Sequence, residues 1–136
     1  MSRCRAGLLL MGVVCPLLSL PWRSDLDLFS TGELLFTAVI FAPLTETLLT
    51  QMLPVSLARR FFRANDFHCF LAASVPFALL HSLSAISTVL AAGIPCGIAL
   101  GLAYVSLVDQ GKGRAFVIVT AIHALHNLNA SVTALA

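Results

Sequence analysis

The sequence predicts an all-α membrane protein, a polytopic helical bundle of about five transmembrane helices that forms one domain over residues 1–136. The 136 residues are 59% hydrophobic and 10% charged, with a mean hydropathy of +0.96, whereas a typical soluble domain is roughly 25% charged. Basic residues stand in short clusters between apolar stretches and not along one face. This pattern predicts the lipid bilayer as a partner and argues against nucleic-acid binding.

The apolar stretches define the expected spans, because about 20 residues cross a hydrocarbon core of about 30 Å. The stretch 67–108 contains no charged residue, and as a single helix it would reach about 63 Å. We therefore expect it to turn back at Ser82–Thr88, where hydroxyl groups can bond a broken backbone. The five expected spans are residues 6–22, 34–58, 67–84, 86–108 and 115–136.

Five spans place seven of the eight basic residues on one side of the membrane. The positive-inside rule then predicts a cytoplasmic N-terminus and a C-terminus on the opposite side. Four spans would move Lys112 and Arg114 away from the basic cluster at 59–63, which breaks the rule. The alternative for the first stretch is a cleaved signal peptide, although no A-x-A site follows it.

The fourth expected span carries glycines every four residues, at Gly93, Gly97 and Gly101. Such a stripe lets a neighbouring backbone approach closely, and Pro95 is expected to kink the helix. The four cysteines form no C-x-x-C pair, so we expect them to be small core residues.

Three ionisable side chains within the spans, Glu46, His81 and His123, are the main candidate functional residues. A charged group at the bilayer centre costs about 2.5–3.5 kcal/mol on insertion scales, so such residues are expected to be paired or functional. At about 1.5 Å rise per residue, these three residues and Asn127 lie about 12–21 Å from the cytoplasmic ends of their helices. Three separate helices thus bring polar groups to one layer of the membrane.

Two motifs with a spacing of four residues support this site. Phe77 precedes His81 by one helical turn and Asn127 follows His123 by one turn, so each pair shares a helix face. His126 lies on a different flank of its helix from Asn127. We expect His126 to support the site or to pack against a neighbouring helix.

Polar residues also surround Glu46. Thr47, Thr50 and Gln51 are expected to supply hydrogen bonds that hold its carboxylate. Prolines before and after this group indicate that the helix is bent or locally open here.

This set of residues suits hydrolysis by an activated water. In one scheme Glu46 is the general base, His81 orients the water, and His123 with Asn127 stabilises the oxyanion. In the other, Glu46, His81 and His123 hold a divalent metal such as zinc with an open position for water; no cofactor is needed if the glutamate scheme operates. Two alternatives to a catalytic site are a structural polar cluster that joins helices and a pathway for protons or ions.

Three segments, Ala42–Gln51, Phe77–His81 and His123–Asn127, resemble the ordered motifs of the CAAX-protease and bacteriocin-processing family (CPBP, also called Abi) of intramembrane proteases. The family patterns are E-E-x-x-x-R, F-x-x-x-H and H-x-x-x-N, of which the second and third are intact here. The resemblance covers about residues 34–136, the motif-bearing core of the chain.

The resemblance implies a CPBP-like helical core with Glu46 as the catalytic glutamate and His81 sharing in water activation. It implies His123 and Asn127 as the oxyanion-stabilising pair. The implied activity is that of an intramembrane endopeptidase, regarded in many members as a metalloprotease. Its partners would be membrane-associated peptide or protein substrates, processed in the CAAX-type or bacteriocin-processing manner.

The first motif departs from the family pattern at two positions. Thr47 stands in place of the second glutamate, and Gln51 in place of the arginine. The alternative function is therefore that of a catalytically inactive CPBP-like membrane protein, acting in bacteriocin immunity or as a structural helper subunit.

Overall fold

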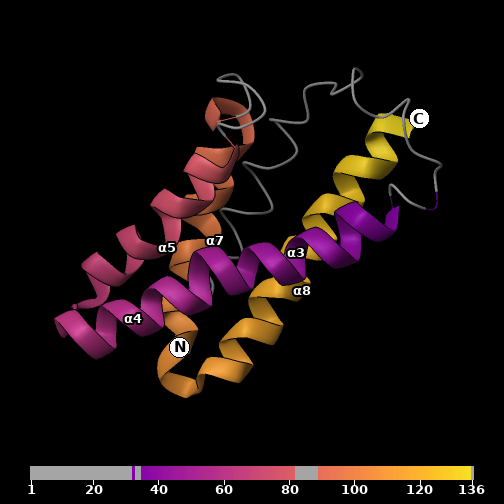
Figure 1. Cartoon of the computed structure of the whole chain (residues 1–136). Helices are drawn as coiled ribbons and strands as arrows, with labels where there is room; N and C mark the ends of the chain where they lie inside the picture. The colour runs from indigo at the N-terminus through magenta and orange to yellow at the C-terminus, as the bar shows by residue number, and fades with distance from the viewer. Residues whose placement is uncertain (1–31, 33–34, 82–88, 136) are drawn as a thin grey trace.

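The computed structural model describes residue 32 and residues 35–81 and 89–135 (Figure 1). Every element in this part of the chain is helical, which confirms the predicted all-α class there. The expected span 6–22 and the expected turn at Ser82–Thr88 lie outside the described residues. In chain order the elements are η2 (Phe36–Phe41), α3 (Ala42–Glu46), η3 (Thr47–Met52), α4 (Leu53–Phe62), α5 (Asp66–His81), η4 (Val89–Gly93), α7 (Ile94–Leu107), η5 (Val108–Gln110) and α8 (Lys112–Leu135).

Two helical stretches are long and apolar enough to cross a membrane. The first is Phe36–Phe62, in which η2, α3, η3 and α4 follow one another without a break, and the second is Lys112–Thr133. The helices Asp66–His81 and Ile94–Gln110 are apolar but shorter. The described part of the chain thus contains two candidate spans, and the count of five stays a prediction.

Each π-helical segment precedes a proline. The segments η2, η3 and η4 end two residues before Pro43, Pro54 and Pro95, respectively. Proline lacks an N–H and its ring clashes with the carbonyl four residues earlier. A wider turn with bonds between residues five apart relieves that clash. The prolines therefore widen the helices locally, consistent with the expected opening around Glu46.

The turn between α4 and α5 is short and well capped. Arg63 ends α4 in the left-handed conformation (φ 48°), and the N–H of Ala64 donates to the carbonyl of Ala58 at 3.2 Å, as in a C-terminal helix cap. The side chain of Asn65 accepts a hydrogen bond from the N–H of His68 at 3.0 Å, which caps the start of α5.

Arg59 joins three elements at this end of the molecule. Its guanidinium binds Asp66 in the first turn of α5 at 3.0 Å and also binds Asp109 in η5. Gly111 separates η5 from α8. Its φ is 127°, a backbone conformation that favours glycine. Arg59 thus links the C-terminal end of α4 to the start of α5 and to η5, the segment that leads into α8.

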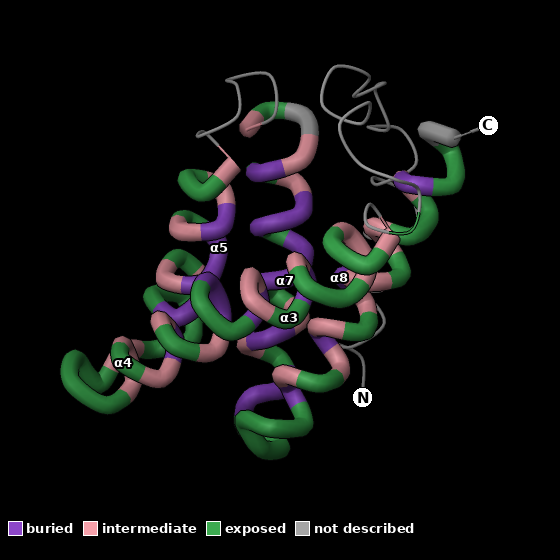
Figure 2. Tube along the Cα trace, turned by 45° about the vertical axis from the view of Figure 1, so that its right-hand side comes forward, coloured by how far each residue is buried: buried purple, intermediate pink, exposed green. Residues whose placement is uncertain are grey.

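The helices α5 and α7 lie side by side and pack closely in both views (Figures 1 and 2). As expected, the glycine stripe forms the contact: a Cβ placed at Gly97 would lie 2.9 Å from the carbonyl oxygen of Ser74 on α5. Figure 2 shows the buried faces turned towards this centre. The buried apolar side chains form one cluster: Val55, Cys69, Ala73, Phe77, Cys96, Leu100, Tyr104, Leu107, Val108, Ala115 and Val119.

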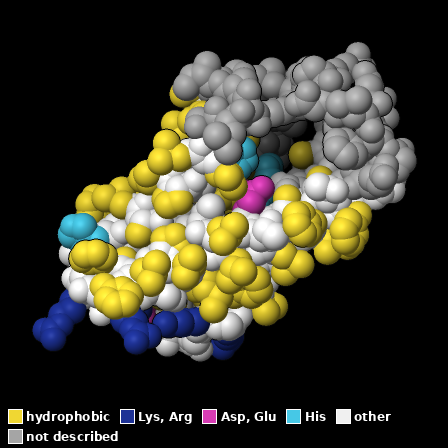
Figure 3. All heavy atoms as spheres, in the orientation of Figure 1, with side chains coloured by type: hydrophobic (Ala, Val, Ile, Leu, Met, Phe, Trp, Pro, Cys, Tyr) yellow, Lys and Arg dark blue, Asp and Glu magenta, His cyan; other side chains and the backbone are white. Residues whose placement is uncertain are grey.

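Large apolar side chains also cover much of the outside. Phe61, Phe62 and Leu125, for example, are 66%, 82% and 67% exposed. Figure 3 shows such side chains over most of one face, with basic side chains gathered at one end. An apolar exterior with charge at one end is what a bilayer favours.

Candidate functional site

The candidate site lies where the helix 36–62 packs against α5 and α8. Glu46 is the last residue of α3, and its Oε2 lies 3.7 Å from Nε2 of His123 on α8. The two side chains are 20% and 4% exposed. A separation of 3.7 Å is too long for a direct hydrogen bond, but one water can bond both atoms. The pair is therefore suited to hold a water molecule beside a carboxylate.

His81 completes the group from the end of α5. Its Nδ1 lies 2.9 Å from the carbonyl oxygen of Phe77. Because a carbonyl only accepts, Nδ1 carries the proton, and Nε2 of the neutral ring keeps a lone pair. The imidazole of His81 interacts electrostatically with Glu46 and with His123. The structure therefore brings Glu46 and His123 together, while the convergence of all three residues stays a prediction.

Phe77 holds both imidazoles. Its ring is 1% exposed and stacks on His81 with centroids 4.6 Å apart. The same ring meets His123 edge-on at 5.5 Å. The spacing of four residues predicted the first contact, whereas the second depends on how α8 packs against α5.

Thr50 supports Glu46 through the backbone. Its hydroxyl donates to the carbonyl oxygen of Glu46 at 2.7 Å, so the expectation that it bonds the carboxylate is wrong. Threonine commonly bonds the carbonyl four residues earlier within a helix, and Thr133 forms the same bond in α8.

Thr47 and Gln51 do not hold the carboxylate either. Both side chains are 0% exposed. The hydroxyl of Thr47 and both amide atoms of Gln51 have no hydrogen-bond partner within the described part of the chain. The expectation that these two side chains hold the carboxylate of Glu46 is therefore wrong, and both face the interior of the bundle.

Asn127 binds the backbone of the helical stretch that contains Glu46. Its Nδ2 donates to the carbonyl oxygen of Ala38 in η2 at 2.8 Å. Ala38 stands eight residues before Glu46 in the same continuous helical stretch. The amide of Asn127 thus joins α8 to η2, and its role with His123 at the reacting centre stays a prediction.

His126 has a partner that the sequence did not indicate. Its Nε2 lies 3.5 Å from Sγ of Cys96 on α7, and its imidazole interacts electrostatically with that of His123. The contact with Cys96 shows that His126 packs against a neighbouring helix, which was one of the two expectations for it. Thirty residues separate Cys96 from His126 and no motif links them, so no signal in the sequence could have identified this contact.

The metal scheme requires three ligands around one ion. Carboxylate and imidazole are groups that zinc accepts. Within residues 32, 35–81 and 89–135, however, no three His, Cys, Asp or Glu side chains lie close enough together to share an ion. As placed, the set Glu46, His81 and His123 therefore fits a held water better than a metal centre.

Comparison with known families identifies one match. The family model described as type II CAAX prenyl endopeptidase Rce1-like matches residues 30–129, which include all three motifs. Comparisons with curated proteins and with solved structures find no match.

Proposed function

Because this chain belongs to the Rce1-like family of type II CAAX prenyl endopeptidases, a family of membrane proteases, we propose that it is an intramembrane endopeptidase that activates water with Glu46. The observation that carries the proposal is the meeting of Glu46 and His123 at 3.7 Å inside an apolar helical bundle. An ionisable pair in such surroundings is costly and is a functional candidate by default.

The reaction follows from the chemistry of these groups. A water held between Glu46 and His123 attacks the carbonyl carbon of the scissile peptide bond and gives a proton to the Glu46 carboxylate. The N–H of the His123 imidazole donates to the oxyanion that forms. Collapse of the tetrahedral intermediate breaks the C–N bond, and the leaving amine takes the proton from Glu46.

His81 positions the water in this scheme. Its Nδ1 is engaged by the backbone of Phe77, so Nε2 is an acceptor and can orient a water hydrogen or share the proton with Glu46. Phe77 fixes the ring by stacking, which removes rotational freedom that the reaction would otherwise have to overcome.

The proposed substrates are membrane-associated peptides, with the prenylated C-terminal peptides named in the family description as the first candidates. The carboxylate of Glu46 retains 20% exposure, so a substrate can reach it without unfolding of the bundle. Figure 3 shows an acidic side chain beside histidines on a face that is otherwise largely apolar. Such surroundings favour a substrate that carries a lipid or a membrane segment.

The test is cleavage by the purified full chain in detergent, read by mass spectrometry. Substrates are a farnesylated peptide ending in a CAAX sequence and a set of unprenylated membrane-tethered peptides. We expect Glu46→Gln to lower kcat by about 10²–10⁴-fold, the usual contribution of a general base, and His81→Ala and His123→Ala to lower it severely. His68→Ala is the matched control, because His68 is exposed and bonds Asn65 at the start of α5.

Two results would overturn the proposal. One is cleavage by Glu46→Gln at the wild-type rate, and the other is a folded wild-type protein that cleaves none of these peptides. The second result would favour the inactive immunity or helper protein, an alternative motivated by Thr47 and Gln51 in the first motif.

A further inference from the structure

The reaction described above does not use one set of buried polar side chains in the interior of the bundle. The set consists of Thr47 and Gln51 on η3 and Tyr104 on α7, each 0% exposed. Their hydroxyl and amide atoms, together with Nδ1 of His123, have no hydrogen-bond partner in the part of the chain that the structure describes. We name the three side chains Thr47, Gln51 and Tyr104 the inner polar cluster.

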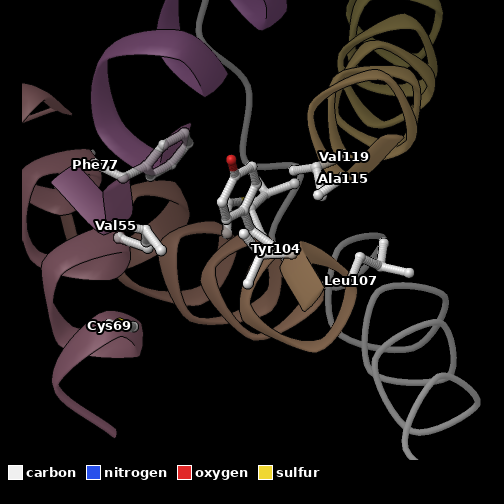
Figure 4. Close-up of a cluster of buried hydrophobic side chains, with 11 residues drawn as sticks. Val55, Cys69, Phe77, Tyr104, Leu107, Ala115 and Val119 are labelled. Atoms are coloured by element: carbon white, nitrogen blue, oxygen red, sulfur yellow. The ribbon is translucent and has the colours of Figure 1, made fainter. Parts of the chain in front are cut away.

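Tyr104 places the cluster next to His123. Figure 4 shows the hydroxyl of Tyr104 directed into the space between Phe77 and Val119. Phe77, Tyr104 and Val119 all belong to the buried core. The ring of Phe77 contacts the ring of His123, and Val119 precedes His123 by one turn on the same face of α8. The hydroxyl of Tyr104 and the imidazole of His123 therefore face the same interior region.

Gln51 and Thr47 approach this region from η3. They lie one and two turns before Val55, which belongs to the same core as Tyr104, and all three side chains on this face are 0% exposed. The segment η3 packs against α5, α7 and α8. Amide and hydroxyl groups thus enter one interior region from two elements.

Apolar neighbours cannot satisfy these groups, and a buried donor or acceptor without a partner is strongly unfavourable. Water is the ligand that fits, because it donates and accepts and needs two to four polar partners. We propose that the inner polar cluster binds water inside the bundle and that this water donates a hydrogen bond to Nδ1 of His123.

The consequence concerns the proton of His123. If Nδ1 accepts a hydrogen bond, the proton of the neutral ring resides on Nε2, the nitrogen that faces Glu46. Gln51 and Tyr104 are then positioning residues that fix the imidazole in the form that can donate to the oxyanion. This catalytic consequence rests on the proposed function, whereas the water site itself does not.

The test is X-ray radiolytic footprinting of the full chain in detergent, in which bound water forms hydroxyl radicals that oxidise the side chains it touches. Tyr104 is compared with Leu100, which is 1% exposed on the same helix. The variant Gln51→Met keeps the length of the side chain but removes the amide. Leu49→Met is the matched control, since Leu49 is 56% exposed on the outer face of η3.

We expect Tyr104 to be oxidised in the wild type while Leu100 is protected. Gln51→Met should lower the oxidation rate of Tyr104 by about threefold or more, because a water loses one of its few partners, and Leu49→Met should not change it. Thr47→Val, which is nearly isosteric, should also lower the oxidation rate of Tyr104. This variant tests the water site if Gln51→Met does not fold. Protection of Tyr104 equal to that of Leu100, or oxidation unaffected by either variant, overturns the water site.

The kinetic readout is separate. Gln51→Met and Tyr104→Phe should lower kcat by about tenfold with KM unchanged, as for a small misplacement of a reacting group. An unchanged kcat together with a changed footprint would refute the positioning of His123 and keep the water site. If the wild type proves not to be a protease, the footprint still decides whether the water is bound.

Discussion

The glycine stripe of α7 makes the contact between α5 and α7 testable with a single methyl group. In Gly97→Ala the new Cβ would lie 2.9 Å from the carbonyl oxygen of Ser74 and 3.3 Å from Cδ1 of Phe77. Ordinary contact begins at 3.4 Å, so the backbone of α5 must move by about 0.5 Å. Overpacking costs about 1–3 kcal/mol, and the better helix propensity of alanine offsets about 0.8–1.0 kcal/mol. We expect a net loss of up to about 2 kcal/mol in the free energy of unfolding.

Gly101→Ala provides an internal comparison. Its new Cβ would clash with the hydroxyl of Ser74, a side-chain atom, whereas the nearest backbone atom, the carbonyl oxygen of Phe70, lies at an ordinary contact distance of 3.5 Å. Ser74→Ala should therefore restore the stability of Gly101→Ala to within about 0.5 kcal/mol of Ser74→Ala alone. It should not restore Gly97→Ala, because the carbonyl oxygen of residue 74 remains in place.

The measurement is thermal unfolding in one detergent, where a loss of 1 kcal/mol lowers Tm by about 2–8 °C for domains near this size. The control is Gly113→Ala, since a Cβ at Gly113 meets nothing within 4 Å. Its Tm should stay the same or rise. Equal Tm values for Gly97→Ala and Gly113→Ala, or rescue of Gly97→Ala by Ser74→Ala, would refute the close approach of the two helices.

Three further predictions concern the site. Asn127→Leu should cost about 0.5–1.5 kcal/mol of stability through its lost bond to Ala38; a fall in kcat of about 10²–10³-fold at unchanged Tm would instead assign Asn127 to the oxyanion. Gly93→Ala would place a Cβ 3.1 Å from Cβ of His81, so kcat measured on the cleaved peptide should fall by about tenfold, with Gly113→Ala unchanged. A zinc chelator added to the purified enzyme should leave the cleavage rate unchanged, because the ligands as placed do not encircle an ion; loss of cleavage that added zinc reverses would contradict this.

Local sequence patterns predicted much of the helical framework and the candidate residues. Composition and hydropathy indicated apolar helices, because a chain with 10% charged residues cannot cover them with a polar surface. The spacing of four residues predicted the stacking of Phe77 on His81 and the close approach at Gly97, since both depend on the helical repeat. Each of these features is set by neighbours within one or two turns.

Contacts around Glu46 were predicted less well. The hydroxyl of Thr50 bonds the carbonyl of Glu46 four residues earlier, a bond that threonine commonly forms within helices and that competes with a bond to the carboxylate. Thr47 turns inward and is fully buried. The position of Pro54 indicated that the helix widens in η3, but not the directions of these side chains.

By itself the sequence determined that the chain folds as apolar helices suited to a membrane, and it predicted that a carboxylate and two histidines occupy similar depths in them. Only the tertiary structure decided that His123 meets Glu46 while Asn127 reaches Ala38 instead. The reason is that hydropathy and the helical repeat determine only the features set by neighbours within one or two turns of a helix. Which faces of distant helices touch depends on their crossing and rotation, and these are fixed by packing at positions such as Gly97 and by the wide turns before the prolines.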